Sequence, residues 1–279
     1  MLLHAPAKLN LCLYLGDPRE DGLHDLCSLF EPLALADLIR VGPGERDEVI
    51  CPGVDGENLA TRALAGLRER GWDREPLRVE IEKRVPVAAG LGGGSGDAAA
   101  ILRLAAGEVA DLPQLAAELG ADVPSQLRPS LALVRGAGER VHPLPEPVEH
   151  AAVLLPGGGG LSTAAVFAEA DRLGLGRPAE ELDELAGRLR EVAGAGASPL
   201  AYPELLVNDL EPAALSLRPH IGEALDELRS AGAPIAILSG SGPTAVGLFP
   251  DLPAAQAAAE NLAAAEVIVC AAGRARLEP

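Results

Sequence analysis

The stretch AGLGGGSGDAAAILRLAA, residues Ala89–Ala106, places a run of glycines and one serine directly before alanine, isoleucine and leucine. Glycine permits backbone conformations that other residues avoid, whereas the alanine-rich continuation favours a helix. The first amides of a helix have no partners within it, and the helix dipole makes this end positive. The stretch therefore predicts a loop whose backbone binds a phosphate-sized anion.

Two polar residues lie where this loop meets the helix. We expect Ser95 to be the N-cap of the helix, or to offer its hydroxyl to a phosphate or to a magnesium ion. We expect Asp97 in the first helical turn, where the dipole favours a carboxylate. Such a loop can also be no more than a tight turn between a strand and a helix, although three consecutive glycines exceed what a turn requires.

The two common phosphate-loop motifs do not fit the stretch. A Walker loop requires a lysine after its last glycine, and a dinucleotide fingerprint requires a βαβ unit with an acidic residue about 20 positions later. Neither feature is evident, so any lysine that assists a bound nucleotide must come from elsewhere. Only two of the 23 basic residues are lysines, Lys8 and Lys83. A lysine in an arginine-rich chain can mark a position that needs a compact ammonium group, although for Lys83 chance explains it equally well.

Composition narrows the classes of function. The 279 residues carry a formal net charge of -18 and only 2% aromatic residues, which argues against nucleic-acid binding through phosphate contacts or base stacking. No apolar stretch approaches the roughly 18 to 20 residues that a membrane span needs, and the N-terminus lacks the pattern of a cleaved leader. The four cysteines are dispersed without a C-x-x-C pair, which is typical of a reduced compartment. We therefore expect a cytoplasmic protein that binds neither membrane nor nucleic acid.

The order of the periodic segments predicts an α+β protein. Alternation typical of strands occurs at residues 5–15, 24–33, 35–41, 77–85, 130–136, 151–156, 234–240, 244–249 and 266–272. Helical composition and period occur at residues 97–106, 111–120, 162–173, 178–192, 220–232 and 251–265. The proline-rich segment LPEPVEH indicates a boundary, so we expect domains over residues 1–148 and 149–279, with one large domain as the alternative.

Four segments resemble one enzyme family in order and spacing. PVAAGLGGGSGDAAA, residues 86–100, is similar to the second motif of the superfamily of galactokinase, homoserine kinase, mevalonate kinase and phosphomevalonate kinase, the GHMP kinases. APAKLNLCLYLGDPREDGLHDLCSLFEPLALAD, residues 5–37, is more specific and resembles the start of the 4-diphosphocytidyl-2-C-methyl-D-erythritol kinases of the non-mevalonate isoprenoid route. LGADVP at residues 119–124 and LSGSGPTAVGLF at residues 238–249 also match that family.

This resemblance implies a fold and an activity. The fold is the two-domain GHMP kinase architecture, with an N-terminal domain like domain 2 of ribosomal protein S5 and a C-terminal ferredoxin-like domain. The activity is transfer of a phosphoryl group from ATP, with magnesium, to the 2-hydroxyl of 4-diphosphocytidyl-2-C-methyl-D-erythritol. The active site is expected in the cleft between the domains.

Two catalytic residues follow from the same resemblance. Asp122, in GADVP, matches the catalytic aspartate, and Lys8, in APAKLN, matches the lysine beside it. An aspartate can accept or orient the proton of the substrate hydroxyl, and an ammonium can stabilise charge that passes from the hydroxyl oxygen to the γ-phosphate. From composition alone, Asp122 is equally well a surface or helix-capping residue, and Lys8 a lysine whose stem covers apolar surface.

The resemblance also implies binding residues. The nucleotide contacts are Asn58, near the adenine, and Pro86, Gly90, Leu91, Gly92, Gly93, Gly94, Ser95 and Gly96. The substrate contacts are Asn10 to the erythritol, His24 to the cytosine, Thr163 as a polar contact, Phe167 as a stacking ring, and the third-motif turn Ser239, Gly240, Ser241 and Gly242. Without the resemblance, a histidine on a strand, a phenylalanine in a helix and a turn between strands are each compatible with a structural role.

Three positions depart from the family pattern. Leu23 stands where the family usually has tyrosine, which removes one side of the cytosine stack and about 1 kcal/mol of stacking. Gly96 stands where a second serine is common, which affects a phosphate or metal contact. Ser125–Gln126 replaces a bulky apolar pair and alters the packing beside Asp122.

Two alternative functions stay open. A sister kinase acting on mevalonate, phosphomevalonate or homoserine needs no stacking wall for a nucleobase, so the segment GLHDLCSLF and Phe167 discriminate against it. A non-catalytic RNA-binding module is the other alternative, because S5-like topology also occurs in ribosomal proteins, but the acidity and the few aromatic residues oppose it. We expect a monomer or a weak homodimer.

Overall fold

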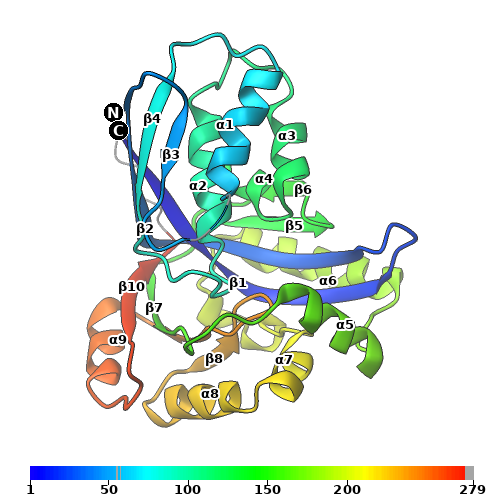
Figure 1. Ribbon diagram of the computed structural model, residues 1–279. Helices are drawn as coiled ribbons and strands as arrows, with labels where there is room; N and C mark the ends of the chain where they lie inside the picture. Colours follow the sequence, from blue (N-terminus) through cyan, green and yellow to red (C-terminus); the bar gives the residue numbers. More distant parts are fainter. Residues whose placement is uncertain (55, 57, 274–279) are drawn as a thin grey trace.

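The computed structural model describes residues 1–54, 56 and 58–273. Figure 1 shows two parts, one above the other, with the first half of the chain forming most of the upper part and the second half most of the lower part. Helices and strands contribute to both parts. The arrangement agrees with the predicted α+β class.

Every segment predicted from its period contains an element of the expected type. The strands are β1 (Leu2–Pro18), β2 (His24–Pro43), β3 (Glu48–Ile50), β4 (Leu77–Glu82), β5 (Ala132–Gly136), β6 (Arg140–Pro143), β7 (His150–Leu155), β8 (Ile235–Leu238), β9 (Ala245–Phe249) and β10 (Ile268–Ala272). The helices are α1 (Leu59–Glu69), α2 (Gly93–Arg103), α3 (Leu112–Leu119), α4 (Val123–Gln126), α5 (Thr163–Leu173), α6 (Ala179–Gly194), α7 (Glu211–Leu217), α8 (His220–Ser230) and α9 (Leu252–Ala259).

Five short or polar elements were not predicted: α1, α4, α7, β3 and β6. The strands β3 and β6 have three and four residues, too few for an alternating pattern to be recognised. Helix α1 could have been found, because its buried residues include positions 60, 63, 64 and 67, which follow a helical period.

The upper part is built on the long antiparallel pair of β1 and β2. Pairing runs from Leu2–Arg40 to Pro18–His24 and shifts register three times. β2 also pairs with β4 towards its C-terminal end and with β5 towards its N-terminal end. Apolar side chains of β1, β2 and β4 pack against α1, α2 and α3, which fixes α2 over β1.

The lower sheet has the strand order β10-β7-β9-β8, and all neighbours are antiparallel. If these four strands are numbered 1 to 4 along the chain, from β7 to β10, their order in the sheet is 4-1-3-2, which is the order of a ferredoxin-like fold. Helices α8 and α9 pack on this sheet. The connection from β7 to β8 is long and carries α5, α6, α7 and α8.

One hydrophobic cluster joins the two parts. It contains side chains from β1 and β2, from β7, β8 and β9, and from α6. β10 also pairs with β2 at Ala272–Leu33, which connects the upper and lower sheets. The domain boundary expected between residues 148 and 149 falls between β6 and β7 and stays a prediction.

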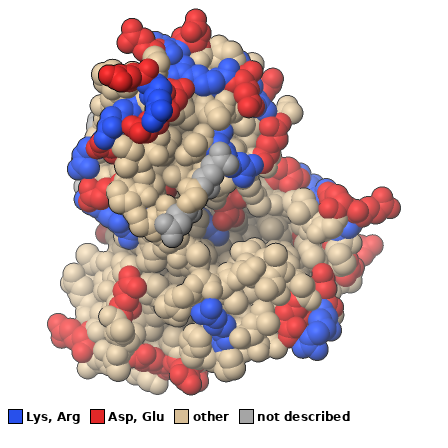
Figure 2. Space-filling model, viewed as in Figure 1, with Lys and Arg blue, Asp and Glu red and all other residues tan. Residues whose placement is uncertain are grey.

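The surface is strongly acidic, as the net charge requires. Figure 2 shows Asp and Glu side chains around the outer edges of both parts and a hollow between the parts. Within the described ranges, no helix combines the length and apolar character needed to cross a bilayer.

A buried ion pair connects β2 to the beginning of β7. His150 Nε2 lies 3.0 Å from Glu31 Oε2, and His150 Nδ1 lies 3.0 Å from the Val148 carbonyl. Both ring nitrogens therefore face acceptors, so the imidazolium form, which donates from both, suits this position. Burial lowers the pKa of His150, but the hydrogen bond and charge of Glu31 outweigh burial and raise it above its ordinary value.

This pair predicts a pH dependence of stability. A raised pKa in the folded protein gives a stabilisation that is complete below the unfolded pKa of about 6.5 and is lost as pH rises through the folded pKa. In that window the free energy of unfolding should fall by up to about 1.4 kcal/mol per pH unit through this group. Urea unfolding between pH 6 and 9 should show this slope for the wild type and its loss for His150→Gln. A slope that persists in His150→Gln and disappears in His142→Gln, at an exposed position, would contradict the assignment.

Candidate active site

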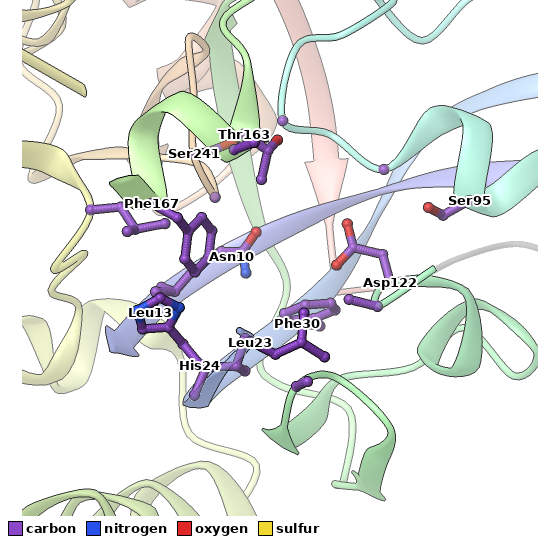
Figure 3. A pocket seen from close by; sticks show the side chains of 18 of the residues that line it. Asn10, Leu13, Leu23, His24, Phe30, Ser95, Asp122, Thr163, Phe167 and Ser241 are labelled. Atoms are coloured by element: carbon purple, nitrogen blue, oxygen red, sulfur yellow. Dashed lines mark hydrogen bonds between the residues drawn. The ribbon is translucent and has the colours of Figure 1, made fainter. Parts of the chain in front are cut away.

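A cavity of about 720 Å³ opens between the two parts. Its walls come from β1, β2, the beginning of α2, the residues before α4, helix α5 and the turn between β8 and β9 (Figure 3). Most of the predicted site residues line it, namely Lys8, Asn10, His24, Gly90, Gly92, Ser95, Asp122, Thr163, Phe167, Gly240 and Ser241. Segments that are distant in sequence therefore meet at one place.

Lys8 lies on β1 and is buried, with 4% of its surface exposed. Its Nζ donates to Asn10 Oδ1 at 2.6 Å and lies 3.1 Å from Asp122 Oδ2. The ammonium also lies 4.7 Å from the centre of the Phe30 ring, within cation–π range. A lysine that only covered apolar surface with its stem would keep its ammonium in water, so that interpretation is wrong.

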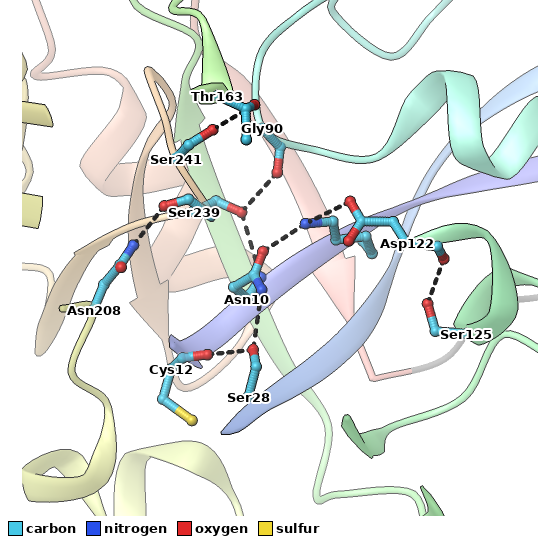
Figure 4. A network of polar contacts seen from close by, with 12 residues as sticks. Asn10, Cys12, Ser28, Gly90, Asp122, Ser125, Thr163, Asn208, Ser239 and Ser241 are labelled. Atoms are coloured by element: carbon cyan, nitrogen blue, oxygen red, sulfur yellow. Dashed lines mark hydrogen bonds and ion pairs between the residues drawn. The ribbon is translucent and has the colours of Figure 1, made fainter. Parts of the chain in front are cut away.

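Asp122 directly precedes helix α4, but its side chain makes no capping hydrogen bond. Its carboxylate faces Lys8 instead and lines the cavity (Figure 4). The helix-capping interpretation is therefore wrong. A proton acceptor and a cation side by side can bind a hydroxyl group together with an anion that the hydroxyl attacks.

The glycine loop lies directly against Lys8. Helix α2 begins at Gly93, and the preceding Gly92 adopts the left-handed conformation with φ of 67°. A Cβ atom at Gly92 would lie 2.7 Å from Lys8 Cγ, so a larger residue would push the loop away from the lysine. The Lys8 amide also donates to the Leu91 carbonyl at 2.9 Å. The positive end of α2 is thereby held beside the ion pair of Lys8 and Asp122.

A second cavity, of about 410 Å³, runs along the glycine loop. Its walls include the predicted nucleotide contacts Pro86, Gly90, Leu91, Gly92, Gly93, Gly94 and Ser95. Among the described residues that line it, Lys83 alone is charged, so no carboxylate opposes an anion there. Thr163, Gly90, Gly92 and Ser95 line both cavities, so the two spaces meet at the loop. Exposed helix amides in a wall whose described residues include no carboxylate fit a triphosphate.

Asn58, predicted to lie near the adenine, is not among the lining residues of this cavity. Its Oδ1 accepts from the Thr61 amide at 2.9 Å and caps α1. The next residue, Leu59, lines the cavity. The structure therefore places Asn58 beside the cavity wall with its side chain engaged in the cap.

Three expectations about the beginning of α2 need correction. Ser95 is not the N-cap, because Gly92 occupies that position; the Ser95 side chain lies within the first turn and lines the cavities. Asp97 is not in the first turn and is buried one turn further on. The Gly96 amide donates to the Gly92 carbonyl at 2.8 Å, and Gly96 lines neither cavity, so this geometry does not support a nucleotide contact by Gly96.

The turn between β8 and β9 holds the glycine loop from the lower part. Ser239 Oγ donates to the Gly90 carbonyl at 3.2 Å (Figure 4). Thr244 Oγ1 donates to the Ala89 carbonyl at 2.6 Å. Ser239 Oγ also accepts from the backbone amide of Asn10 at 3.3 Å. The turn connects two strands of a hairpin, and these bonds also attach it to the glycine loop and to β1 of the upper part.

Only part of this turn reaches the cavity. Gly240 and Ser241 line it, and Ser241 Oγ lies 2.9 Å from Thr163 Oγ1. Ser239 is fully buried and Gly242 is absent from the described cavity lining, so direct substrate contact by these two residues is not supported.

The end of the cavity away from the glycine loop is formed by β1, β2 and α5. The ring centres of His24 and Phe167 lie 5.3 Å apart, and the ring planes are tilted by 51° (Figure 3). His24 Nε2 lies 2.8 Å from Asp171 Oδ1. Leu23 is 52% exposed here and presents an aliphatic side chain where the family pattern has a ring.

Lys83 occupies a defined position between two buried carboxylates. Its Nζ lies 2.5 Å from Asp37 Oδ2 and 2.8 Å from Asp97 Oδ2. Asp37 Oδ1 also accepts from the amides of Arg84 and Val85 at 2.6 and 2.8 Å. Burial raises the pKa of Asp97 to about 7, although the Lys83 ammonium acts in the opposite direction. The group attaches the chain that enters the glycine loop to β2 and α2.

Among the cavity residues that were not predicted, Phe30 and Asp171 contact predicted site residues. Phe30 lies against the Lys8 ammonium, and Asp171 contacts His24. Asp171 could have been found, because it follows Phe167 by four residues and Thr163 by eight, so all three fall on one helix face. Nothing in the sequence around Phe30 indicated that its ring faces the lysine.

Comparison with known proteins identifies the family. The model for the GHMP kinases N terminal domain matches residues 58–128, and that for GHMP kinases C terminal matches residues 184–268. The 4-diphosphocytidyl-2-C-methyl-D-erythritol kinase of Kineococcus radiotolerans is 42% identical over 270 residues, covering 90% of this chain and 82% of the relative. This chain belongs to the 4-diphosphocytidyl-2-C-methyl-D-erythritol kinase family. The resemblance drawn from the sequence is thereby confirmed.

Solved structures agree with this family assignment. A crystal structure of 4-(cytidine 5'-diphospho)-2C-methyl-D-erythritol kinase is 36% identical, with a TM-score of 0.81 and coverage of 99% of this chain and 100% of that chain. The L. major mevalonate kinase, solved with R-mevalonate, is 15% identical, with a TM-score of 0.71 and coverage of 99% and 96%. The second likeness shows the fold alone, and the predicted two-domain GHMP kinase architecture is confirmed.

The two residues that depart from the family pattern after Asp122 differ in their polar contacts. Ser125 Oγ donates to the Asp122 carbonyl at 2.8 Å, which stabilises the turn that carries the carboxylate. The backbone carbonyl of Gln126 accepts from Arg103 at 2.8 Å. The side-chain oxygen Oε1 of Gln126 is buried and has no hydrogen-bond partner among the described residues.

The group around Lys83 predicts a large effect on stability. Lys83→Met would leave two buried carboxylates without their cation, which typically costs about 3 to 5 kcal/mol. Urea unfolding should show this loss, whereas Arg84→Met, which removes an exposed neighbouring cation, should cost about 0.5 kcal/mol. Equal midpoints of urea unfolding for Lys83→Met and Arg84→Met would show that Lys83 does not stabilise the glycine loop.

Proposed function

We propose that this chain transfers the γ-phosphoryl group of ATP to the 2-hydroxyl of 4-diphosphocytidyl-2-C-methyl-D-erythritol, in non-mevalonate isoprenoid synthesis. The single observation that supports this most strongly is the Lys8–Asp122 pair, 3.1 Å apart, beside the beginning of α2. Family membership supports the same reaction. The pair lines the larger cavity, which meets the second cavity at the glycine loop.

In this proposal each charged group has one task. Asp122 accepts or orients the proton of the 2-hydroxyl, so that the oxygen can attack the phosphorus atom. Lys8 stabilises the charge on the transferring phosphoryl group in a site from which water is largely excluded. Asn10 fixes the Lys8 ammonium through the hydrogen bond of 2.6 Å. Its side-chain amide donates one hydrogen bond to Ser28 Oγ at 3.0 Å, which leaves its second N–H for the erythritol.

The glycine loop would hold the ATP phosphates. Gly92, Gly93, Gly94 and Ser95 present the amides at the beginning of α2, and Ser95 Oγ can bind a phosphate or the accompanying magnesium ion. Magnesium supplies charge neutralisation between the β- and γ-phosphates when it is bound. Within the described ranges no group of three or more His, Cys, Asp or Glu could hold a metal ion. The ion would therefore come with the nucleotide.

The opposite end of the larger cavity would hold the cytosine. Phe167 offers one stacking face, His24 a hydrogen-bonding edge, and Thr163 a polar contact near Ser241. Sister kinases for mevalonate or homoserine need no such wall. A non-catalytic RNA-binding module would leave the buried Lys8–Asp122 pair without a purpose.

The proposal extends to organisation and location. It includes two domains, residues 1–148 and 149–279, with the active site in the cleft between them. It also includes a cytoplasmic enzyme that acts as a monomer or weak homodimer on small molecules, without nucleic acid or membrane.

Substitution of the catalytic pair should separate binding from chemistry. Asp122→Asn should keep ATP affinity and lose about 100-fold or more in kcat, because the amide cannot accept the proton. Lys8→Arg should also lose turnover, because the planar guanidinium does not fit the place of the ammonium beside Gly92. Asp111→Asn, an exposed carboxylate before α3, serves as the control. Wild-type turnover in Asp122→Asn would remove its catalytic role.

A panel of alcohols tests the substrate. With Mg-ATP, ADP release should occur with 4-diphosphocytidyl-2-C-methyl-D-erythritol and not with mevalonate, phosphomevalonate or homoserine. Turnover with one of the latter and none with the cytidine compound would assign the chain to a sister reaction. Salt-sensitive RNA retention on a filter without any ADP release would support the RNA-binding alternative instead.

A further inference from the structure

Residues 207–209 of the lower part run beside β1. The Leu13 amide donates to the Val207 carbonyl, and the Leu13 carbonyl accepts from the Asp209 amide, both at 2.8 Å. Leu13 and Asn208 thereby form an isolated parallel bridge. The backbone of Asn208 is therefore fixed relative to β1, the strand that carries the buried ammonium group.

The side chain of Asn208 is buried and holds the turn between β8 and β9. Its Nδ2 donates to the Leu238 carbonyl at 2.8 Å and to the Gly240 carbonyl at 2.7 Å, and its Oδ1 accepts from the Leu210 amide at 2.9 Å. A flipped amide would direct its oxygen at two carbonyl oxygens, so these partners fix one orientation. The position of the amide therefore determines the position of the turn.

The turn held in this way lies against the charged group of β1. A Cβ atom at Gly240 would lie 3.1 Å from Asn10 Oδ1 and 3.6 Å from Lys8 Nζ. Gly240 has a φ of 57°, in the left-handed region that glycine adopts without strain. Its backbone is thus a wall beside the hydrogen bond between Lys8 and Asn10. A turn that moved away from β1 would give the ammonium room to change position.

We propose that Asn208 is a positioning residue for phosphoryl transfer, which fixes Gly240 against Asn10 and Lys8 and thereby keeps the ammonium in place. This inference rests on the proposed function, because that function gives the ammonium its task. Asn208 is not among the described residues that line either cavity. It acts through Gly240 and touches no ligand.

Phosphoryl transfer is sensitive to such positioning. The protein contributes little covalent chemistry to this reaction, so the rate depends on where the charged groups lie relative to the phosphoryl group. A misplacement of about 1 Å caused by a remote substitution can cost about 100-fold in rate. Loss of Asn208 should therefore lower kcat even though every group that contacts ATP or the alcohol is still present.

The test measures kcat at saturating Mg-ATP, with whichever alcohol of the panel the wild type phosphorylates, and refers it to the folded fraction. Asn208→Ala should lose about tenfold or more. Asn208→Asp keeps the shape and the acceptor but directs an oxygen at both carbonyls, so it should lose a similar factor. The matched control is Tyr14→Phe, which removes the buried 2.8 Å bond from Tyr14 Oη to the Leu205 carbonyl, another link between β1 and the lower part. It should lower the thermal midpoint and leave kcat unchanged.

A double-mutant cycle tests the path through Gly240. Gly240→Ala should lower kcat by itself, because the added Cβ would press on Asn10 Oδ1. If Asn208 acts through Gly240, Asn208→Ala combined with Gly240→Ala should lose no more than the worse of the two single variants. Losses that multiply would show that the two residues act independently and would overturn the path.

The outcomes separate this inference from the proposed function. Turnover of another alcohol and none of the cytidine compound would overturn the proposed substrate, and the Asn208 variants would be measured with that other alcohol. Wild-type kcat in both Asn208 variants, or an equal loss in Tyr14→Phe, would overturn the positioning role. ADP release with no alcohol at all would overturn both.

Discussion

A buried ammonium group determines how the rest of the site is arranged. Lys8 lies buried on β1, and burial of a charge is unfavourable unless partners compensate it. Its partners, the Asn10 amide oxygen and the Asp122 carboxylate, come from the same strand and from a segment more than 100 residues later. The glycine loop completes the enclosure, because only a residue without a side chain can lie against the lysine stem at Gly92. Enclosure and catalytic geometry are therefore consequences of the same packing.

The second constraint is that the two parts of the molecule must hold their relative position. Hydroxyl groups of Ser239 and Thr244 bond carbonyls of the glycine loop, so the lower part fixes the loop that the upper part supplies. The Glu31–His150 pair and the shared core behind α6 join the parts at a second place. A cavity between parts joined in this way keeps its polar groups in defined positions before any ligand arrives, which lowers the cost of binding and of reaching the transition state.

The two ends of the larger cavity differ in how closely they follow the family pattern. The catalytic end keeps its lysine, aspartate and glycine loop, and substitutions there, such as Ser125, add hydrogen bonds around the aspartate. The opposite end, which we propose binds the base, has Leu23 where the family pattern has a ring, and holds the carboxylate of Asp171 beside His24.

The sequence by itself determined the local elements and the identities of the reactive groups, because period, glycine content and motif spacing are local properties. It placed Lys8, Asp122 and the loop in one family pattern, and most strands and helices in the right order, although α1, α4, α7, β3 and β6 were not predicted. Only the tertiary structure decided that α2 begins at Gly93 rather than near Ser95, since packing of Gly92 against Lys8 sets that start. Likewise Lys83 gained its two carboxylate partners, and His24 its contact with Asp171, from segments brought together by strand pairing and helix packing. Such contacts depend on distances between remote residues, which no local pattern encodes.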